Sequence, residues 1–409
     1  MIAQVPIDTN AKHPARPIRV CVVNASPHVF GAEKSMAYLI GHLATAGFRF
    51  LLLSPGGETE RFFRENAVSD AYEIPMLRLE RCPMVLLGRM LHLLRSNIQA
   101  LHRLRLIRPD VLHANGLQSL LQVFLPALLL RIPLVWHIRD LSHPRWIVRL
   151  CGMLARKILV PSKAAAEKYG WLGDKVCLVA NPIFPAVPAQ HRSTLDSAAV
   201  DNEAIRTLLD RNSGIFKIGL VGQIIPRKGH DLLLDALPGI LDQVPQARVF
   251  FIGADLFKPD SRFEVSLQER LQASPGLRER VHFTGYLRNV EEVYGALDLL
   301  AIPSREETFG RVAIEAMAAG CLVVAARTGG LTEIIQSGRN GLLFDPENPS
   351  ALAESIVELA LNAGLRGDLI GKGYETAAQW VVVSGESAHR VEEVYRDLCR
   401  NQQQIGEKP

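Results

Sequence analysis

Two runs of alternating strand and helix patterns, separated by a break, constrain the fold of this 409-residue chain more than any other feature. Short stretches rich in Val, Ile and Leu are typical of buried strands. In the first run they are residues 18–24, 48–54, 110–115, 133–138 and 157–162, with helical patterns at 32–46, 84–107 and 117–130. Such alternation predicts a parallel sheet covered by helices on both faces.

The second run begins after a proline-rich stretch at 181–204, where we place the domain linker. Its predicted strands are 216–222, 247–253, 281–285, 298–304 and 321–326, and one long helix is expected at 387–404. We therefore predict an α/β protein with two doubly wound, Rossmann-like domains facing a cleft. The first domain is expected at 1–184, completed by a C-terminal helix at about 385–409, and the second at 185–384.

Composition narrows the class of protein. With 48% hydrophobic and 22% charged residues, the chain is typical of globular proteins. The six cysteines are scattered, without a CxxC pair or a histidine cluster, so neither a disulfide framework nor a metal site is predicted. No apolar signal segment opens the chain, and the longest uncharged run, 114–130, is too short and polar for a membrane span. We expect a cytoplasmic protein.

The charge is divided unevenly between the two halves. Residues 1–180 hold 23 Lys and Arg against 12 Asp and Glu, whereas the rest hold 23 against 30. Residues 81–108 contain six arginines and no acid: Arg81, Arg89, Arg95, Arg103, Arg105 and Arg108. A basic amphipathic helix indicates peripheral attachment to the inner face of an anionic membrane. A packed helix with an exposed basic face is the alternative. Nucleic acid is not an expected partner, because stacking aromatics are absent there.

The segment "VGQIIPRKGHDLLL" at 221–234 carries cations beside a helix N-terminus. A strand is expected to end at Gly222, a loop to carry Arg227 and Lys228, and a helix to follow Gly229. Helix N-termini and cations bind phosphates, so this loop favours a diphosphate. A solvated basic loop is the alternative. No GxGxxG or Walker sequence is present.

Polar side chains also follow three strands of the first domain. "PHVFGAEKSM" at 27–36 places Gly31 where the backbone can approach a ligand, and Glu33 in the first helical turn. Glu33 serves either a ligand or the helix dipole. His113 and His137 end neighbouring strands and are expected near the cleft, although a buried histidine is more often a satisfied core residue.

Two carboxylates, Glu307 and Glu315, interrupt the largely apolar segment "SREETFGRVAIEAMAAG" at 304–320. Eight positions of an ideal helix span ~12 Å, enough to hold separate hydroxyls of one elongated ligand. Carboxylates accept hydrogen bonds well from sugar hydroxyls. The alternative pairs Glu307 with Arg305 or Arg311, and Glu315 with Arg311 at i,i+4.

Taken together, these segments resemble the retaining glycosyltransferases of family 4, which have the two-domain GT-B fold. The resemblance rests on Glu307-x7-Glu315, "GGLTEII" and "GRNGLLF" within 329–344, "GQIIPRKG" at 222–229, "FGAE" at 30–33 and "FTGYLRNVEEVYGALDLLAIPS" at 283–304. It covers roughly 18–400 and is more specific in the second domain than in the first.

The resemblance implies that the second domain binds a nucleotide-sugar donor, such as a UDP- or GDP-sugar, and the first an acceptor. Donor-binding residues would be Gly31, Ala32, Gly222, Gln223, Arg227, Lys228, Glu307, Thr308, Phe309, Gly310 and Glu315. Catalytic residues would be His137, Glu307, Lys228 and Arg227, and acceptor-binding residues Glu33, His113, His137 and Arg139. Family members usually have Arg where this chain has Gln223, and Arg227 is our hypothesis for the replacement.

The implied reaction is retaining transfer of a hexose-type sugar without a metal or cofactor, by front-face attack. The acceptor would be a glycan or lipid-linked sugar of cell-surface polysaccharide or glycolipid synthesis. Another GT-B activity, such as an epimerase or a phosphorylase, is one alternative. A non-catalytic nucleotide-sugar-binding or membrane-associated scaffold is the other.

Overall fold

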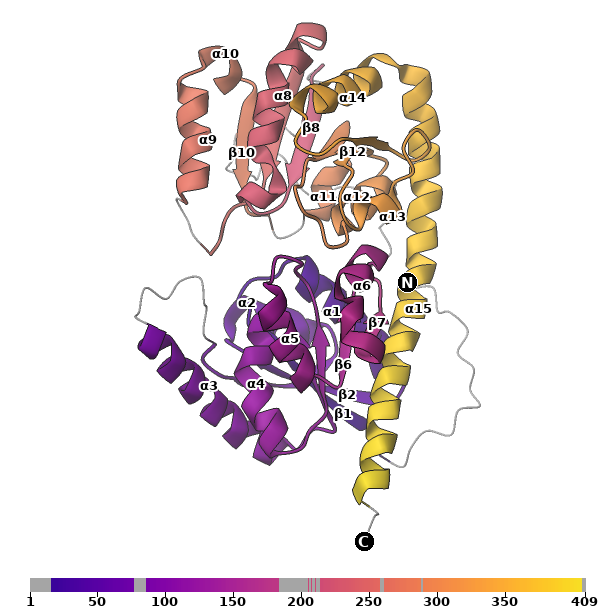
Figure 1. Cartoon of the computed structure of the whole chain (residues 1–409). Coiled ribbons are helices and arrows are strands. Elements are labelled where there is room, and N and C mark those ends of the chain that lie inside the picture. The colour runs from indigo at the N-terminus through magenta and orange to yellow at the C-terminus, as the bar shows by residue number, and fades with distance from the viewer. Residues whose placement is uncertain are drawn as a thin grey trace.

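Two parallel sheets, each flanked by helices, form the protein (Figure 1). The computed structural model describes residues 16–76, 86–183, 205, 207, 210, 214–257, 261–287 and 290–406. The predicted linker beyond Ile183, the start of the basic segment and the N-terminal 15 residues lie largely outside the described residues.

The first sheet has seven strands, in the order β3 (Val68–Glu73), β2 (Phe48–Ser54), β1 (Ile18–Val23), β4 (Val111–Asn115), β5 (Leu134–His137), β6 (Lys157–Val160) and β7 (Val176–Leu178). The second has six, in the order β10 (Val281–Gly285), β9 (Ala247–Ile252), β8 (Phe216–Val221), β11 (Leu299–Ile302), β12 (Leu322–Ala326) and β13 (Leu342–Phe344). The predicted doubly wound architecture is confirmed, and the sequence patterns missed β3, β7 and β13.

Helices cover both faces of each sheet. Those of the first domain are α1 (Gly31–Ala44), α2 (Gly57–Glu65), α3 (Leu86–Ile107), α4 (Leu117–Leu129), α5 (Arg145–Leu154), α6 (Lys163–Tyr169) and the 3-10 turn η1 (Gly170–Lys175). Those that follow are the turn η4 (Pro226–Lys228), α8 (His230–Gln243), α9 (Arg262–Gln272), α10 (Pro275–Arg278), α11 (Glu291–Tyr294), α12 (Arg311–Ala318), α13 (Leu331–Ile334), α14 (Pro349–Leu361) and α15 (Ala363–Gly406).

Helix α15 joins the two domains. It packs against α12 in the second domain and then runs along the first, where Ala388, Val391 and Tyr395 enter the core beside α1 (Figure 1). The helix predicted at 387–404 therefore begins much earlier, at Ala363. The predicted domain limits stay a prediction, because most of the linker is outside the described residues.

Strand order reverses beside the first strand of each domain. β1 lies between β2 and β4, and β8 lies between β9 and β11. Loops that follow the two strands at such a switch point diverge to opposite faces, and ligands of open α/β sheets bind there. In this chain those loops begin at Asn24, Gly116, Gly222 and Pro303.

Candidate functional site

The switch-point loops of the second sheet bring Lys228 and Glu307 together, although 79 positions separate them in the sequence. Lys228 Nζ lies 2.6 Å from Glu307 Oε2, and both side chains are largely buried. Burial alone would raise the pKa of Glu307, but Lys228, Arg227 and the backbone N–H of Phe309 together hold it below its usual value. Glu307 is therefore an ionised carboxylate that contacts a cation, the kind of group that accepts hydroxyl hydrogen bonds.

Glycine makes this arrangement possible at two positions. Gly222 has a φ of 149°, and the Lys228 side chain lies over it, with Cε 3.4 Å from where a β-carbon would stand. At Gly329, with a φ of 46°, a β-carbon would lie 1.9 Å from the carbonyl oxygen of Glu307. The approach at Gly329 leaves no room for a side chain, whereas at Gly222 the contact distance is ordinary and it is the positive φ that favours glycine.

The segment after Glu307 is also buried. Thr308 and Phe309 are buried, and the Phe309 ring meets the edge of Trp380 from α15. Gly310 precedes α12 with a φ of 100°, so Glu307 lies in the loop and Glu315 in the helix. The ~12 Å estimate, which assumed one ideal helix through both carboxylates, therefore does not apply.

Glu315 has partners on both of its oxygens. Arg311 donates to Oε1 from Nε at 3.1 Å and from Nη2 at 2.8 Å, and the Tyr294 hydroxyl donates to Oε2 at 3.0 Å. The i,i+4 pair with Arg311 that the sequence left open is present. Glu307, in contrast, pairs with neither Arg305 nor Arg311, because Arg305 forms a bidentate pair with Asp231.

Arg227 is half-buried, and its Nη1 lies 3.5 Å from the carbonyl oxygen of Glu306. Its charge helps to lower the pKa of Glu307 and, from the other side of the domain interface, that of Asp140. Arg227 thus adds positive charge beside the Lys228–Glu307 pair. Our hypothesis that Arg227 supplies the charge that family members have at the position of Gln223 stays a prediction.

The first domain contributes a buried polar cluster after β1, β4 and β5. Glu33 is buried in the first turn of α1 and accepts a hydrogen bond from the backbone N–H of Phe30 at 3.0 Å. Arg139 donates through Nε to Asn115 Oδ1 at 2.7 Å and through Nη1 to Asn181 Oδ1. Burial raises the pKa of Glu33, and the positive charge of Arg139 opposes that rise.

His113 and His137 are fully buried neighbours on β4 and β5. His113 Nδ1 lies 2.6 Å from the hydroxyl of Tyr395, and its Nε2 lies 3.3 Å from His137 Nδ1. Burial lowers the pKa of both rings, that of His113 to about 3, so both are neutral at pH 7. Both ring nitrogens of His113 therefore have partners inside the domain, Tyr395 and His137, and its acceptor-binding role stays a prediction.

Several contacts join the two domains around these residues. Arg311 reaches the carbonyl oxygen of Gly31, and Lys34 Nζ lies 2.5 Å from Glu291 Oε1. The Tyr286 hydroxyl donates to the carbonyl oxygen of Val29, and Glu333 accepts the N–H groups of Lys163 and Ala164 at the start of α6. Among these contact residues only Gly31 was predicted as a site residue, and the donor and acceptor roles stay a prediction.

Sequence patterns missed several residues that bond at or beside this interface: Asn24, Ser35, Asn115, Asn181, Tyr286 and Tyr294. Single polar residues in loops carry no periodic signal. Asn24 and Asn115, each at the end of a predicted strand, had positions that could have marked them.

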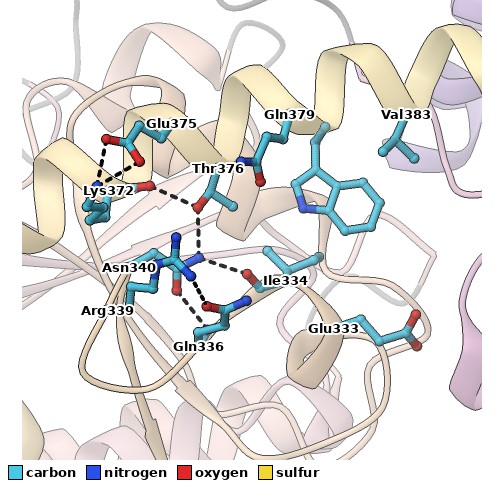
Figure 2. A pocket seen from close by; sticks show the side chains of 11 residues that line it. Glu333, Ile334, Gln336, Arg339, Asn340, Lys372, Glu375, Thr376, Gln379 and Val383 are labelled. Carbon is cyan, nitrogen blue, oxygen red and sulfur yellow. Dashed lines mark hydrogen bonds and ion pairs between the residues drawn. The ribbon is translucent and has the colours of Figure 1, made fainter.

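A separate hollow of about 210 Å³ lies between α15 and the turn after α13 (Figure 2). Its polar groups pair with one another, including Asn340 with Thr376 and Lys372 with Glu375. None of the predicted site residues lines it. We assign the hollow no role.

Comparison with known proteins agrees with this geometry. Residues 29–186 match the family described as Glycosyltransferase Family 4, and residues 215–362 match that described as Glycosyl transferases group 1. A structure of Anabaena HepE in complex with UDP and glucose superposes with a TM-score of 0.74 at 21% identity, covering 92% of this chain and 99% of that one. Sucrose-phosphate synthase from Thermosynechococcus elongatus superposes with a TM-score of 0.69 at 20% identity, covering 94% of this chain and 99% of that one.

These matches define a glycosyltransferase of the GT-B type. The chain belongs to the family 4, or group 1, glycosyltransferases. Among curated relatives, mannosylfructose-phosphate synthase of Agrobacterium fabrum is 27% identical over 58% of this chain and 51% of its own. D-inositol 3-phosphate glycosyltransferase of Corynebacterium jeikeium is 38% identical over 36% of each. The matched stretches thus span about half or less of these relatives.

Proposed function

We propose that the protein is a retaining glycosyltransferase that moves a hexose-type sugar from a nucleotide diphosphate sugar to a glycan or lipid-linked acceptor. The observation that carries this proposal is the Lys228–Glu307 pair, held in the loops at the switch point of the second sheet, with Glu315 in the helix α12 that follows the Glu307 loop. HepE, which shares this fold, is known in complex with UDP-glucose, and this supports a UDP-sugar as the first donor to test.

In the proposed reaction, the bond between the sugar's anomeric carbon and the β-phosphate oxygen breaks, and the acceptor hydroxyl forms the new bond on the same face. Negative charge develops on the departing diphosphate. Lys228, Arg227 and the N–H groups at the start of α12 would stabilise that charge, which is why we propose no metal ion. The departing phosphate would take the acceptor's proton. Glu307 would orient the sugar, and Glu315 would accept hydrogen bonds from the ribose.

Unpaired polar atoms on both domains support a site where an acceptor meets the donor sugar. Within the described residues, His137 Nε2, Arg139 Nη2 and Thr308 Oγ1 are buried and have no hydrogen-bond partner. A buried polar atom without a partner costs about 1–3 kcal/mol, so a ligand rich in hydroxyl or anionic oxygens would satisfy these atoms. With Glu33, they would form the place where the acceptor meets the transferred sugar.

The surface of the first domain supports a membrane-bound acceptor. Helices α3, α4 and α5, which cover one face of the sheet, contain no Asp or Glu. Apolar side chains are exposed on one side of α5, at Trp146 (68% exposed), Leu150 and Met153. Others are exposed along α3, at Met90, Leu91, Leu94 and Ile98. Exposed arginines accompany them at Arg95, Arg103, Arg105, Arg145 and Arg149. This combination suits an anionic bilayer surface. No helix among the described residues has the length and apolar character needed to cross a membrane.

Flotation with vesicles tests the membrane part of the proposal. The protein should float with vesicles containing phosphatidylglycerol and remain unbound with neutral phosphatidylcholine vesicles. Trp146→Ser combined with Leu150→Ser should reduce binding about tenfold or more, because each apolar side chain contributes ~1.5–3 kcal/mol when buried. Leu361→Ser, at an equally exposed position of α14, is the control. Equal flotation with both vesicle types would contradict attachment by charge.

Incubating the protein with UDP-glucose or GDP-mannose, with and without a bacterial lipid extract, tests the activity. A glycosyltransferase should release the nucleoside diphosphate slowly alone and faster with the acceptor mixture, yielding a glycosylated lipid. An epimerase would convert the sugar without an acceptor, and a scaffold would bind the nucleotide sugar without consuming it. Either of the last two results would overturn the proposal.

A further inference from the structure

Arg311 connects three parts of the molecule from the first position of α12. Its side chain is only 9% exposed, and all three of its nitrogens have partners. Nε and Nη2 donate to Glu315 Oε1, whereas Nη1 lies within hydrogen-bonding distance of three oxygens outside the second sheet and its helices. These are Gly31 O at 3.0 Å, Ser35 Oγ at 2.5 Å and Pro182 O at 3.1 Å.

The partners of Nη1 belong to the first domain and its exit. Gly31 and Ser35 lie in the first turns of α1, and Pro182 lies where the chain leaves the first domain. Ser35 Oγ also donates to Pro182 O at 3.1 Å, so the three partners are connected to one another. The guanidinium therefore spans the interface, with one edge on Glu315 and the other on the first domain.

We propose that Arg311 is a positioning residue that makes the orientation of Glu315 depend on the docking of the first domain. The inference rests on the proposed function, in which Glu315 receives the donor's ribose hydroxyls. When the first domain is docked, Nη1 is held at α1 and the opposite edge of the planar group is aimed at Glu315. When the domains separate, Nη1 loses its partners and the guanidinium is free to turn away.

The arrangement leaves room for the ribose. A carboxylate offers about four lone-pair sites, and Arg311 and Tyr294 occupy three of them. The donor therefore need not displace Arg311 in order to bind Glu315. Lysine could not take this place, because one ammonium group lacks the flat, forked geometry that reaches both sides.

A double-mutant cycle between Arg311 and Ser35 tests the coupling, with the affinity for UDP and for UDP-glucose measured by calorimetry. Arg311→Met should weaken binding about tenfold, as expected for hydrogen bonds to a charged group. Ser35→Ala, which leaves Arg311 and Glu315 intact, should weaken it about threefold. The double variant should bind like Arg311→Met alone, because neighbours that act through one contact are not additive.

Two further variants separate coupling from other effects. Arg311→Lys should bind as weakly as Arg311→Met, whereas recovery of wild-type affinity would show that charge alone suffices and overturn the proposal. Lys168→Met removes a more exposed cross-domain pair, that with Glu306, and should change affinity less than about twofold.

The outcomes distinguish the two proposals. If the wild type binds UDP or UDP-glucose but Ser35→Ala binds as tightly, Arg311 acts only within its own helix and the coupling is wrong. Additive losses in the double variant would have the same meaning. If the wild type binds neither compound, the UDP-dependent function is overturned, and the coupling inference with it.

Discussion

At the scale of single residues, the site depends on carboxylates whose pKa burial alone would raise. Glu307 remains ionised because Lys228 Nζ lies 2.6 Å from its carboxylate. Glu315 remains ionised because Arg311, one turn earlier in the same helix, lies 2.8 Å from its carboxylate. For Glu315 too, burial raises the pKa, but Arg311, Lys34 and Tyr294 together hold it below its usual value. Each acid is therefore ionised before any ligand arrives, and can accept hydroxyl hydrogen bonds at neutral pH.

Lys228→Met should destabilise the protein in a pH-dependent way. The folded pKa of Glu307 lies below its ordinary 4.5, so the pair stabilises the fold above pH 4.5 and this contribution is lost as pH falls through the folded pKa. In the variant the buried carboxylate has lost its closest cation, which costs about 3 kcal/mol at pH 7. Urea unfolding should show that the variant's deficit in unfolding free energy, relative to the wild type, shrinks toward pH 4, where Glu307 of the variant takes up a proton.

The control for this prediction is Lys372→Met, which removes an exposed pair with Glu375 and should cost less than about 1 kcal/mol. A deficit of equal size at pH 7 and pH 4 would show that Lys228 stabilises the fold by packing rather than by its charge.

The pairing of Lys228 with Glu307 could not be predicted, although both residues were. The motifs placed each at the end of a strand, but the 79 intervening positions carry no sign of contact. The opposite held for Arg311. Its spacing predicted the pair with Glu315, whereas its contacts with Gly31 and Ser35 depend on how the domains dock.

At the scale of elements, the loop that carries Glu307 is fixed by the turn between β12 and α13. The N–H of Gly330 donates to the carbonyl oxygen of Glu307 at 3.1 Å, and Gly329 lies directly against that oxygen. Phe309, packed on Trp380, anchors the other end of the loop. The position of the Glu307 carboxylate is thus set by backbone contacts between two loops.

Gly329→Ala should displace this loop. Its β-carbon would meet a backbone oxygen that cannot rotate away, at a φ that disfavours alanine, and we expect a loss of about 3 kcal/mol in stability. Donor affinity should fall as well. Gly367→Ala, in the open part of α15, should instead stabilise the protein by about 1 kcal/mol, as measured by thermal unfolding. Unchanged donor affinity in Gly329→Ala would contradict the role of this turn.

Sequence patterns predicted strands well where they were buried, even at four residues, as in β5, β6 and β11. The missed strands β3, β7 and β13 all lie at or next to a sheet edge, and are short or partly exposed. The first half of α15 contains Gly364, Gly367, Gly371 and Gly373, which lower helix propensity. Packing overrides that propensity, since Gly373 lies against Met317 of α12.

At the scale of the whole molecule, the uneven distribution of charge between the two halves matches the different roles that we propose for the two domains. The first domain carries the excess of Lys and Arg, together with the acid-free face formed by α3, α4 and α5. The second carries the loops proposed for the donor. Since Arg311, Tyr286 and Glu333 all cross between the domains, the two halves of the proposed site form together only when the domains are docked.

The central claim is that Glu315 and its neighbours bind a nucleotide sugar. Its most direct test is thermal unfolding with UDP-, GDP- and ADP-sugars, comparing the wild type with Glu315→Gln. One of the donors, at 100 times its Kd, should stabilise the wild type by about 2.7 kcal/mol. Glu315→Gln without ligand should unfold at a lower temperature than the wild type, because the buried Arg311 loses its anionic partner, and it should gain far less than the wild type from that donor. A Glu315→Gln variant that gains as much from the donor as the wild type does would contradict the account, as would a wild type that responds to none of the sugars.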